Sequence, residues 1–73
     1  MTKQGQMVLA YIYDHGSISP LEAFRDLGIT KLATRVSELK REGIRFAQEY
    51  EETTNRFGEK VRYMRYRMGG EHG

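Results

Sequence analysis

The chain has 73 residues, of which 38% are hydrophobic and 30% are charged, and it contains no cysteine. This composition is typical of one small globular domain rather than a disordered chain. A chain of this length buries only about 60% of the surface that its unfolded form exposes, so the core must come from regular elements. Without cysteine there is no disulfide and no thiolate metal site. Because His15 and His72 lie far apart in the sequence, we expect no metal and no other cofactor.

The charge is unevenly distributed around a net value of +2. Residues 31–45 hold five basic and two acidic side chains, and residues 55–68 hold five basic and one acidic. The acidic stretch at residues 49–52 separates them, so the sequence predicts a localised positive surface. No apolar run approaches the roughly 18 residues that span a bilayer, and the first six residues lack the apolar stretch of a signal peptide. We therefore expect a cytoplasmic protein without membrane contact.

The first predicted helix covers about Lys3–His15, because apolar residues recur there at helical spacing, at positions 8, 11 and 12. Gly16 is expected to end it, since glycine adopts a left-handed conformation at low cost. Residues 17–18 are predicted to form a short extended link, with at most a single bridge to another strand.

The second predicted helix begins at the segment Ser19-Pro20-Leu21-Glu22. This segment matches a capping box with proline at the first helical position. Leu21, Phe24 and Leu27 are predicted to form its apolar stripe. Gly28 is expected to end this helix after two turns.

The third predicted helix starts directly after a tight turn, with Thr30 as its cap, and runs from Lys31 to about Glu42 before Gly43. Its predicted inner stripe is made by residues 32, 36 and 39. At 100° per residue, the outward arc holds Lys31, Thr34, Glu38 and Arg41, flanked by Arg35, Ser37 and Glu42.

The last part of the chain changes to a period of two, over Ile44–Glu52 and more strongly over Lys60–Met68, with turn-forming residues between them. We therefore predict a long antiparallel hairpin. One of its faces carries Arg62 with residues 64, 66 and 68 and is expected to cover the helices. The other carries residues 61, 63, 65 and 67 and is expected to present arginine. Residues 1–68 are expected to form one domain, and residues 69–73 a flexible tail.

Residues 17–29 and 32–39 resemble the helix-turn-helix of small phage and prophage proteins. These proteins often continue with an Asn-Arg-Phe-Gly turn, here residues 55–58, and an aromatic and arginine-rich strand, here residues 61–67. The resemblance extends over about residues 5–68. It implies an α+β, winged helix-turn-helix fold, with three helices followed by a two-stranded antiparallel β-hairpin wing.

In this family the third helix enters the major groove of DNA, which makes its outward residues candidate contacts. They are Thr30, Lys31, Thr34, Arg35, Glu38 and Arg41. Arg35 is suited to pair with guanine, and Thr34 to contact a base edge or a thymine methyl group. Glu38 is suited to accept from cytosine or to orient the helix by repelling phosphate. The alternative is a solvated face on which Glu38 pairs with Arg35 or Arg41.

The wing supplies the other candidate contacts, Arg56 and Lys60 near its tip and Arg65 nearer the body, directed to phosphates or a minor groove. The alternative is that arginines on an exposed strand only keep its edge soluble. Tyr63 is expected to face solvent or DNA, whereas Tyr66 is expected to pack inward.

The resemblance therefore implies sequence-specific binding of double-stranded DNA by a phage-type transcriptional regulator or recombination accessory factor. A single domain of this size is expected to need a homodimer or cooperative neighbours on DNA. We expect no enzymatic activity, because Ser19 is accounted for as a cap and His15 as a helix-end residue. One alternative is a protein-interaction module, such as a phage inhibitor of a host complex, which the acidic stretch favours. The other is RNA binding through the arginine and tyrosine strand.

Overall fold

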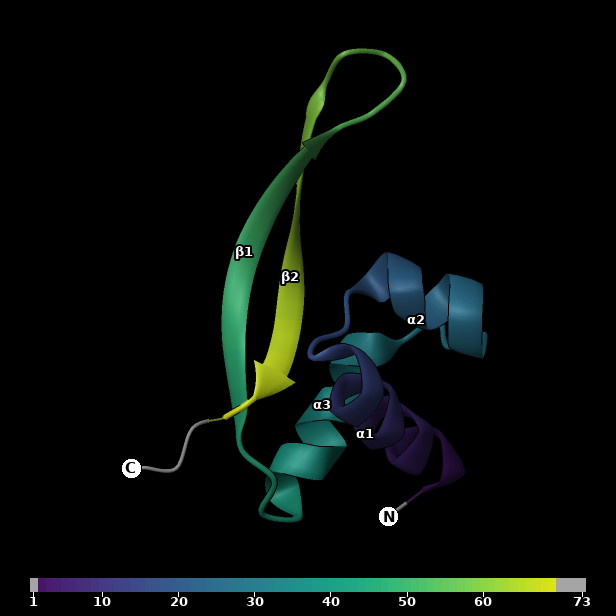
Figure 1. Cartoon of the computed structure of the whole chain (residues 1–73), viewed down its shortest axis with the longest axis vertical. Coiled ribbons are helices and arrows are strands. Elements are labelled where there is room, and N and C mark those ends of the chain that lie inside the picture. Colours follow the sequence, from purple (N-terminus) through teal and green to yellow (C-terminus); the bar gives the residue numbers. More distant parts are fainter. Residues whose placement is uncertain (1, 70–73) are drawn as a thin grey trace.

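The computed structural model describes residues 2–69, which form three helices and a hairpin. The elements are α1 (Lys3–His15), α2 (Pro20–Leu27), α3 (Leu32–Arg41), β1 (Phe46–Thr54) and β2 (Lys60–Met68). The helices pack together beside the lower part of the hairpin, whose tip stands clear of them at one end of the longest axis (Figure 1). The predicted α+β order of three helices and an antiparallel hairpin is therefore confirmed.

The predicted limits of the first two helices are confirmed, and so are the predicted roles of Gly16, Ser19 and Gly28 at their ends, whereas the cap at Thr2 was not predicted. In α1 the Gly5 N–H donates to Thr2 Oγ1, and Gly16 follows the helix at a φ of 91°. In α2 the Glu22 N–H donates to Ser19 Oγ, while the Ser19 N–H donates to Glu22 Oε1. This reciprocal pair is the capping box that the sequence predicts.

The predicted apolar stripe of α2 was wrong at two of its three positions. Leu21 and Phe24 are 67% and 59% exposed, and the helix turns Ala23 and the half-buried Leu27 toward the core instead. These two residues are four positions apart, so they share one face of the helix. The buried face of α2 can be this small because Ile18 and Ile29, which lie just before and just after the helix, are buried and fill the core.

The start of α3 differs from the prediction, whereas Gly43 follows its end as expected, at a φ of 103°. The Thr30 hydroxyl does not cap this helix, because the residue at the cap position is Lys31, and its side chain makes no capping hydrogen bond within the described chain. At the other end, Gly43 N–H donates to Lys40 O, and Ile44 N–H donates to Leu39 O. Ile44 therefore closes the helix in a Schellman motif, which delays the strand until Phe46.

The hairpin pairs in register from Phe46 with Met68 to Thr54 with Lys60. Residues 53–54, which were expected in the turn, belong to β1, and the turn covers only residues 55–59. Because side chains alternate along a strand, the even-numbered residues share one face of the hairpin and the odd-numbered residues share the other.

The core joins all three helices to the base of the hairpin. Its buried hydrophobic residues are Val8, Tyr11, Ile12, Ile18, Ala23, Ile29, Leu32, Val36, Leu39 and Tyr66. The predicted bridge is present, because Ile18 and Tyr66 exchange two backbone hydrogen bonds of 2.9 Å. Tyr66 packs inward as expected, with Phe46 edge-on at 6.4 Å. The even-numbered face thus covers the helices only near the base of the hairpin.

The predicted flexible tail at residues 69–73 lies mostly outside the described residues. Its first residue, Gly69, is half-buried and donates its N–H to Arg45 O at 2.8 Å. This hydrogen bond extends the pairing at the base of the hairpin by one step.

Candidate nucleic-acid interface

The outer face of α3 is accessible along the whole helix. Because α3 buries residues 32, 36 and 39, it exposes Lys31, Ala33, Thr34, Ser37, Lys40 and Arg41. The two ends of this exposed face are basic, and its middle carries only small side chains. The structure thus presents a smooth helical surface with positive charge at both ends.

Two of the predicted contacts on α3, Arg35 and Glu38, are only partly accessible. Arg35 Nη1 lies 3.2 Å from Glu38 Oε1, and the Arg35 side chain is 22% exposed. Arg35 Nε and Glu38 Oε1 are buried without a hydrogen-bond partner in the described part of the chain. This intrahelical ion pair is the alternative that the sequence left open. Base contacts from Arg35 and Glu38 stay a prediction, and Arg35 would have to leave Glu38 to make them.

The even-numbered face of the hairpin continues the exposed surface of α3. Lys40 Nζ donates a hydrogen bond to Gln48 Oε1, which joins the end of α3 to β1. Farther along the same face, the Arg62 guanidinium lies 4.7 Å from the centroid of the Tyr50 ring, a cation–π contact. We name this surface the basic face: Lys31, Thr34, Ser37, Lys40 and Arg41 of α3 with Gln48, Tyr50 and Arg62 of the hairpin.

Sequence reasoning did not select the hairpin members of the basic face. The period-two alternation grouped Arg62 with the core-facing residues of β2 and therefore hid its accessibility. Tyr50 is 65% exposed because the helices cover only the base of the hairpin. Three predicted contacts outside α3 are also exposed, Thr30 in the turn before the helix and Arg56 and Lys60 at the hairpin tip.

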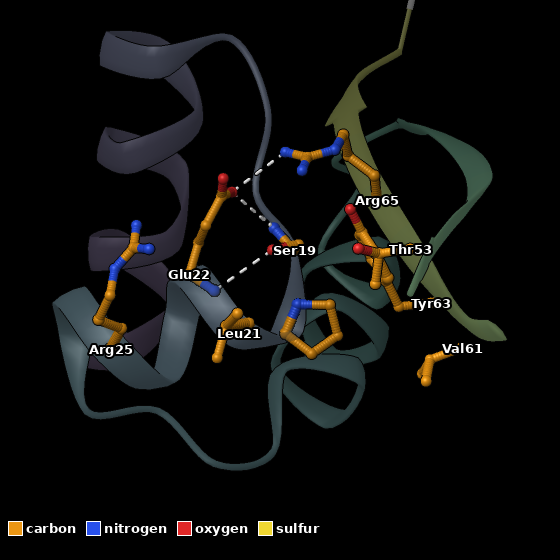
Figure 2. A pocket seen from close by; sticks show the side chains of 9 residues that line it. Ser19, Leu21, Glu22, Arg25, Thr53, Val61, Tyr63 and Arg65 are labelled. Atoms are coloured by element: carbon orange, nitrogen blue, oxygen red, sulfur yellow. Dashed lines mark hydrogen bonds and ion pairs between the residues drawn. The ribbon is translucent and has the colours of Figure 1, made fainter. Parts of the chain in front are cut away.

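Arg65 lies on the odd-numbered face, where it joins the hairpin to the start of α2 (Figure 2). Its guanidinium forms ion pairs with Glu22 at 3.1 Å and with Glu51 at 2.9 Å, and it donates to Ser17 Oγ at 2.9 Å. The Glu51 carboxylate raises the pKa of Arg65, and Arg65 with Tyr63 lowers the pKa of Glu51. Only 16% of the Arg65 side chain is exposed. The geometry therefore gives Arg65 a structural role, and phosphate contact by Arg65 stays an untested prediction.

The acidic stretch at residues 49–52 neutralises much of the odd-numbered face. Glu49 pairs with Arg67 at 3.2 Å, on the same face as the pair formed by Glu51 and Arg65. Tyr63, which was expected to face solvent or DNA, is half-buried and donates its hydroxyl to Glu51 at 2.8 Å. These contacts pair the charges of the odd-numbered face, whereas on the even-numbered face Arg62 lies opposite the exposed Glu52 in the strand register.

A hollow of about 390 Å³ separates the start of α2 from the odd-numbered face (Figure 2). Its apolar lining includes Pro20, Leu21, Val61 and Tyr63. Within residues 2–69, no three His, Cys, Asp or Glu side chains are grouped so that they could hold a metal ion. In the same range, none of the helices has the length and apolar character needed to cross a membrane.

Comparisons with known proteins address the family of this chain. Neither a curated protein nor a solved structure gives a match. A family model described as a winged helix-turn-helix domain matches residues 3–71, a range that includes all five helices and strands. The chain therefore belongs to the winged helix-turn-helix domain family.

Proposed function

We propose that this protein binds double-stranded DNA sequence-specifically and without catalysis, as a phage-type transcriptional regulator or recombination accessory factor in the cytoplasm. In this proposal α3 lies in the major groove and the hairpin lies along the phosphate backbone or in a minor groove. The observation that carries it is the basic face, a single accessible surface that runs from α3 onto the hairpin. Membership in the family supports it, since helix-turn-helix domains place such a helix in the major groove.

The dimensions of α3 fit this placement. A helix with its side chains is about 10–12 Å wide, and the major groove is about 12 Å wide. Ala33 and Ser37, in the middle of the exposed face, are short enough to let the helix approach the base edges closely. Lys31 and Arg41, at the two ends, are placed to reach phosphates on either side of the groove. Thr34 then lies nearest to the bases.

Sequence specificity in this proposal depends on a second copy of the protein. One module of this kind buries only about 600–1,000 Å² on DNA, which is small for selective binding. We therefore propose that a homodimer or cooperative neighbours occupy adjacent half-sites. The expected result is cooperative binding to a duplex with two half-sites about 34 Å apart, lost when the spacing changes by half a helical turn.

The test of duplex binding starts from a DNA duplex selected out of a random library with the wild-type protein. Fluorescence anisotropy then measures its affinity between 50 and 200 mM salt. Substitutions Lys31→Ala and Arg41→Ala should each weaken binding. Each should also make the negative slope of log K against log salt shallower by about 1, as expected for one lost phosphate contact. Arg67→Gln is the matched control, because it removes the same charge from the odd-numbered face. If Lys31→Ala and Arg41→Ala both bind like the wild type and like the control, α3 is not the binding element.

A protein-binding module is the second candidate, and the exposed apolar side chains of α2 favour it. Leu21 lines the hollow, and Phe24 is exposed one helical turn farther along α2. This alternative predicts that duplex resin retains little protein, and that Leu21→Ser abolishes capture of a partner without changing DNA affinity. Competition between RNA and duplex DNA tests RNA binding, which would be favoured if RNA displaced the duplex at equal concentration.

A further inference from the structure

The hairpin tip exposes a large aromatic side chain at the point farthest from the core. Phe57 is 79% exposed, and the tip stands clear of the helices at the end of the molecule (Figure 1). Exposing a phenylalanine ring to water is unfavourable relative to burying it in an apolar environment. An apolar ring held in this position is therefore poised to enter an apolar environment supplied by another molecule.

The backbone around Phe57 is held by its neighbour Asn55. Asn55 Oδ1 accepts from the Phe57 N–H at 2.9 Å and from the Glu59 N–H at 3.1 Å. The Asn55 N–H donates to Glu59 O, and Gly58 closes the turn with a φ of 79° and an N–H bond to Asn55 O. The turn thus has a defined shape before any partner binds, which lowers the entropic cost of insertion.

The charges and reach of the tip favour DNA as the partner. Exposed Arg56 and Lys60 flank Phe57, and the Glu59 carboxylate accepts a hydrogen bond from Asn55 Nδ2. The tip is about seven residues, or roughly 23 Å, beyond Gln48, where the hairpin meets α3. Half a turn of B-DNA, which separates a major groove from the next minor groove, is about 17 Å. The hairpin is therefore long enough for its tip to reach the minor groove next to the α3 site.

We infer that the tip inserts the Phe57 ring between two base pairs in the minor groove beside the α3 site, and so bends the duplex. This inference rests on the proposed duplex binding. Apolar wedges that enter the minor groove partly unstack one base step and kink the DNA toward the major groove. Burial of the ring offsets the unstacking cost, and Arg56 is attracted by the negative potential of the groove. The even-numbered face then follows the backbone between the two grooves.

The test measures bending and unstacking separately from affinity. The selected duplex carries a donor and an acceptor dye at its ends, and 2-aminopurine replaces adenine at successive steps. Wild-type protein should raise energy transfer and increase 2-aminopurine fluorescence at one step. Phe57→Ala should lose both signals and bind about tenfold more weakly, given the apolar surface it no longer buries. Phe57→Leu, which keeps an apolar wedge, should retain part of the bend.

Tyr13→Ala is the matched control, because Tyr13 is an exposed aromatic residue of α1, outside the basic face and the tip. It should bend DNA like the wild type, and circular dichroism should show that all variants are folded. Bending by Phe57→Ala equal to that of the wild type would overturn the inference, and so would binding of wild type without bending. A wild-type protein that binds none of the duplexes would instead overturn the proposed function itself.

Discussion

Replacing Arg65 by Met should destabilise the fold while leaving the DNA-binding surface intact. The guanidinium holds Glu22 at 3.1 Å and Glu51 at 2.9 Å, and only 16% of the Arg65 side chain is exposed. Hydrogen bonds to charged groups each contribute about 1.5–3 kcal/mol, and partial exposure of both carboxylates reduces this value. We expect a loss of about 2 kcal/mol in the free energy of unfolding. For a domain of this size that loss lowers Tm by about 10 °C.

The assay is thermal and urea unfolding followed by circular dichroism, with Arg67→Met as the control. Arg67 is 44% exposed and its ion pair with Glu49 is the exposed kind, so its loss should change stability by less than about 0.5 kcal/mol. Equal losses for the two variants would refute the structural role of Arg65. A normal Tm combined with a lower salt slope of DNA binding would show instead that Arg65 contacts phosphate.

The acid dependence of this ion-pair network gives an independent check. Glu51 has a lowered pKa in the folded state, so it stabilises the fold above its ordinary pKa of 4.5. That stabilisation is lost as pH falls below this value through the lowered pKa. The difference in unfolding free energy between wild type and Arg65→Met should therefore shrink as pH falls from 6 to 2. A difference that stays constant over this range would contradict the contribution of Glu51.

Three further predictions follow from other contacts. The Arg25 and Tyr11 hydrogen bonds lower the pKa of Asp26 from 3.8 to about 2, so this carboxylate stabilises the fold above pH 3.8 and ceases to do so by pH 2; acid titration of Asp26→Asn should show a weaker loss over that range than the wild type. Leu39→Ala, at a side chain 1% exposed, should cost about 3 kcal/mol in urea unfolding, and a loss below 1 kcal/mol would contradict its place in the core. Asn55→Ala should speed amide hydrogen exchange at the hairpin tip without changing exchange in α1, and unchanged tip exchange would show that Asn55 does not hold the turn.

The helix limits could be predicted wherever local chemistry alone determines them. The capping box at Ser19 and Glu22 fixes the start of α2 within four residues of sequence, and Gly16 ends α1 through its own backbone conformation. The end of α3 was less predictable because Ile44 is apolar and fits a strand pattern equally well. Only the packed structure shows that its N–H closes the helix.

The face that each side chain occupies was harder to predict than the elements themselves. Leu21 and Phe24 are apolar at helical spacing, yet the orientation of α2 is set by Ala23 and by the buried isoleucines around the helix. Alternation placed Arg62 and Arg65 on opposite faces of the hairpin, but the sequence could not show which of the two faces stays accessible. Both lie on one basic strand, but the placement of Glu22 beside the hairpin pairs Arg65 and leaves Arg62 on the exposed face.

The most direct test of the proposed interface is a titration of the ¹⁵N-labelled protein with its selected duplex, followed by NMR. If α3 and the even-numbered hairpin face contact the DNA together, the largest amide shifts should fall on Thr34, Ser37, Arg41 and Arg62, with Tyr13 unchanged. Shifts confined to the hollow between α2 and the odd-numbered face, or to α1, would contradict the assignment of the basic face as the DNA-binding surface.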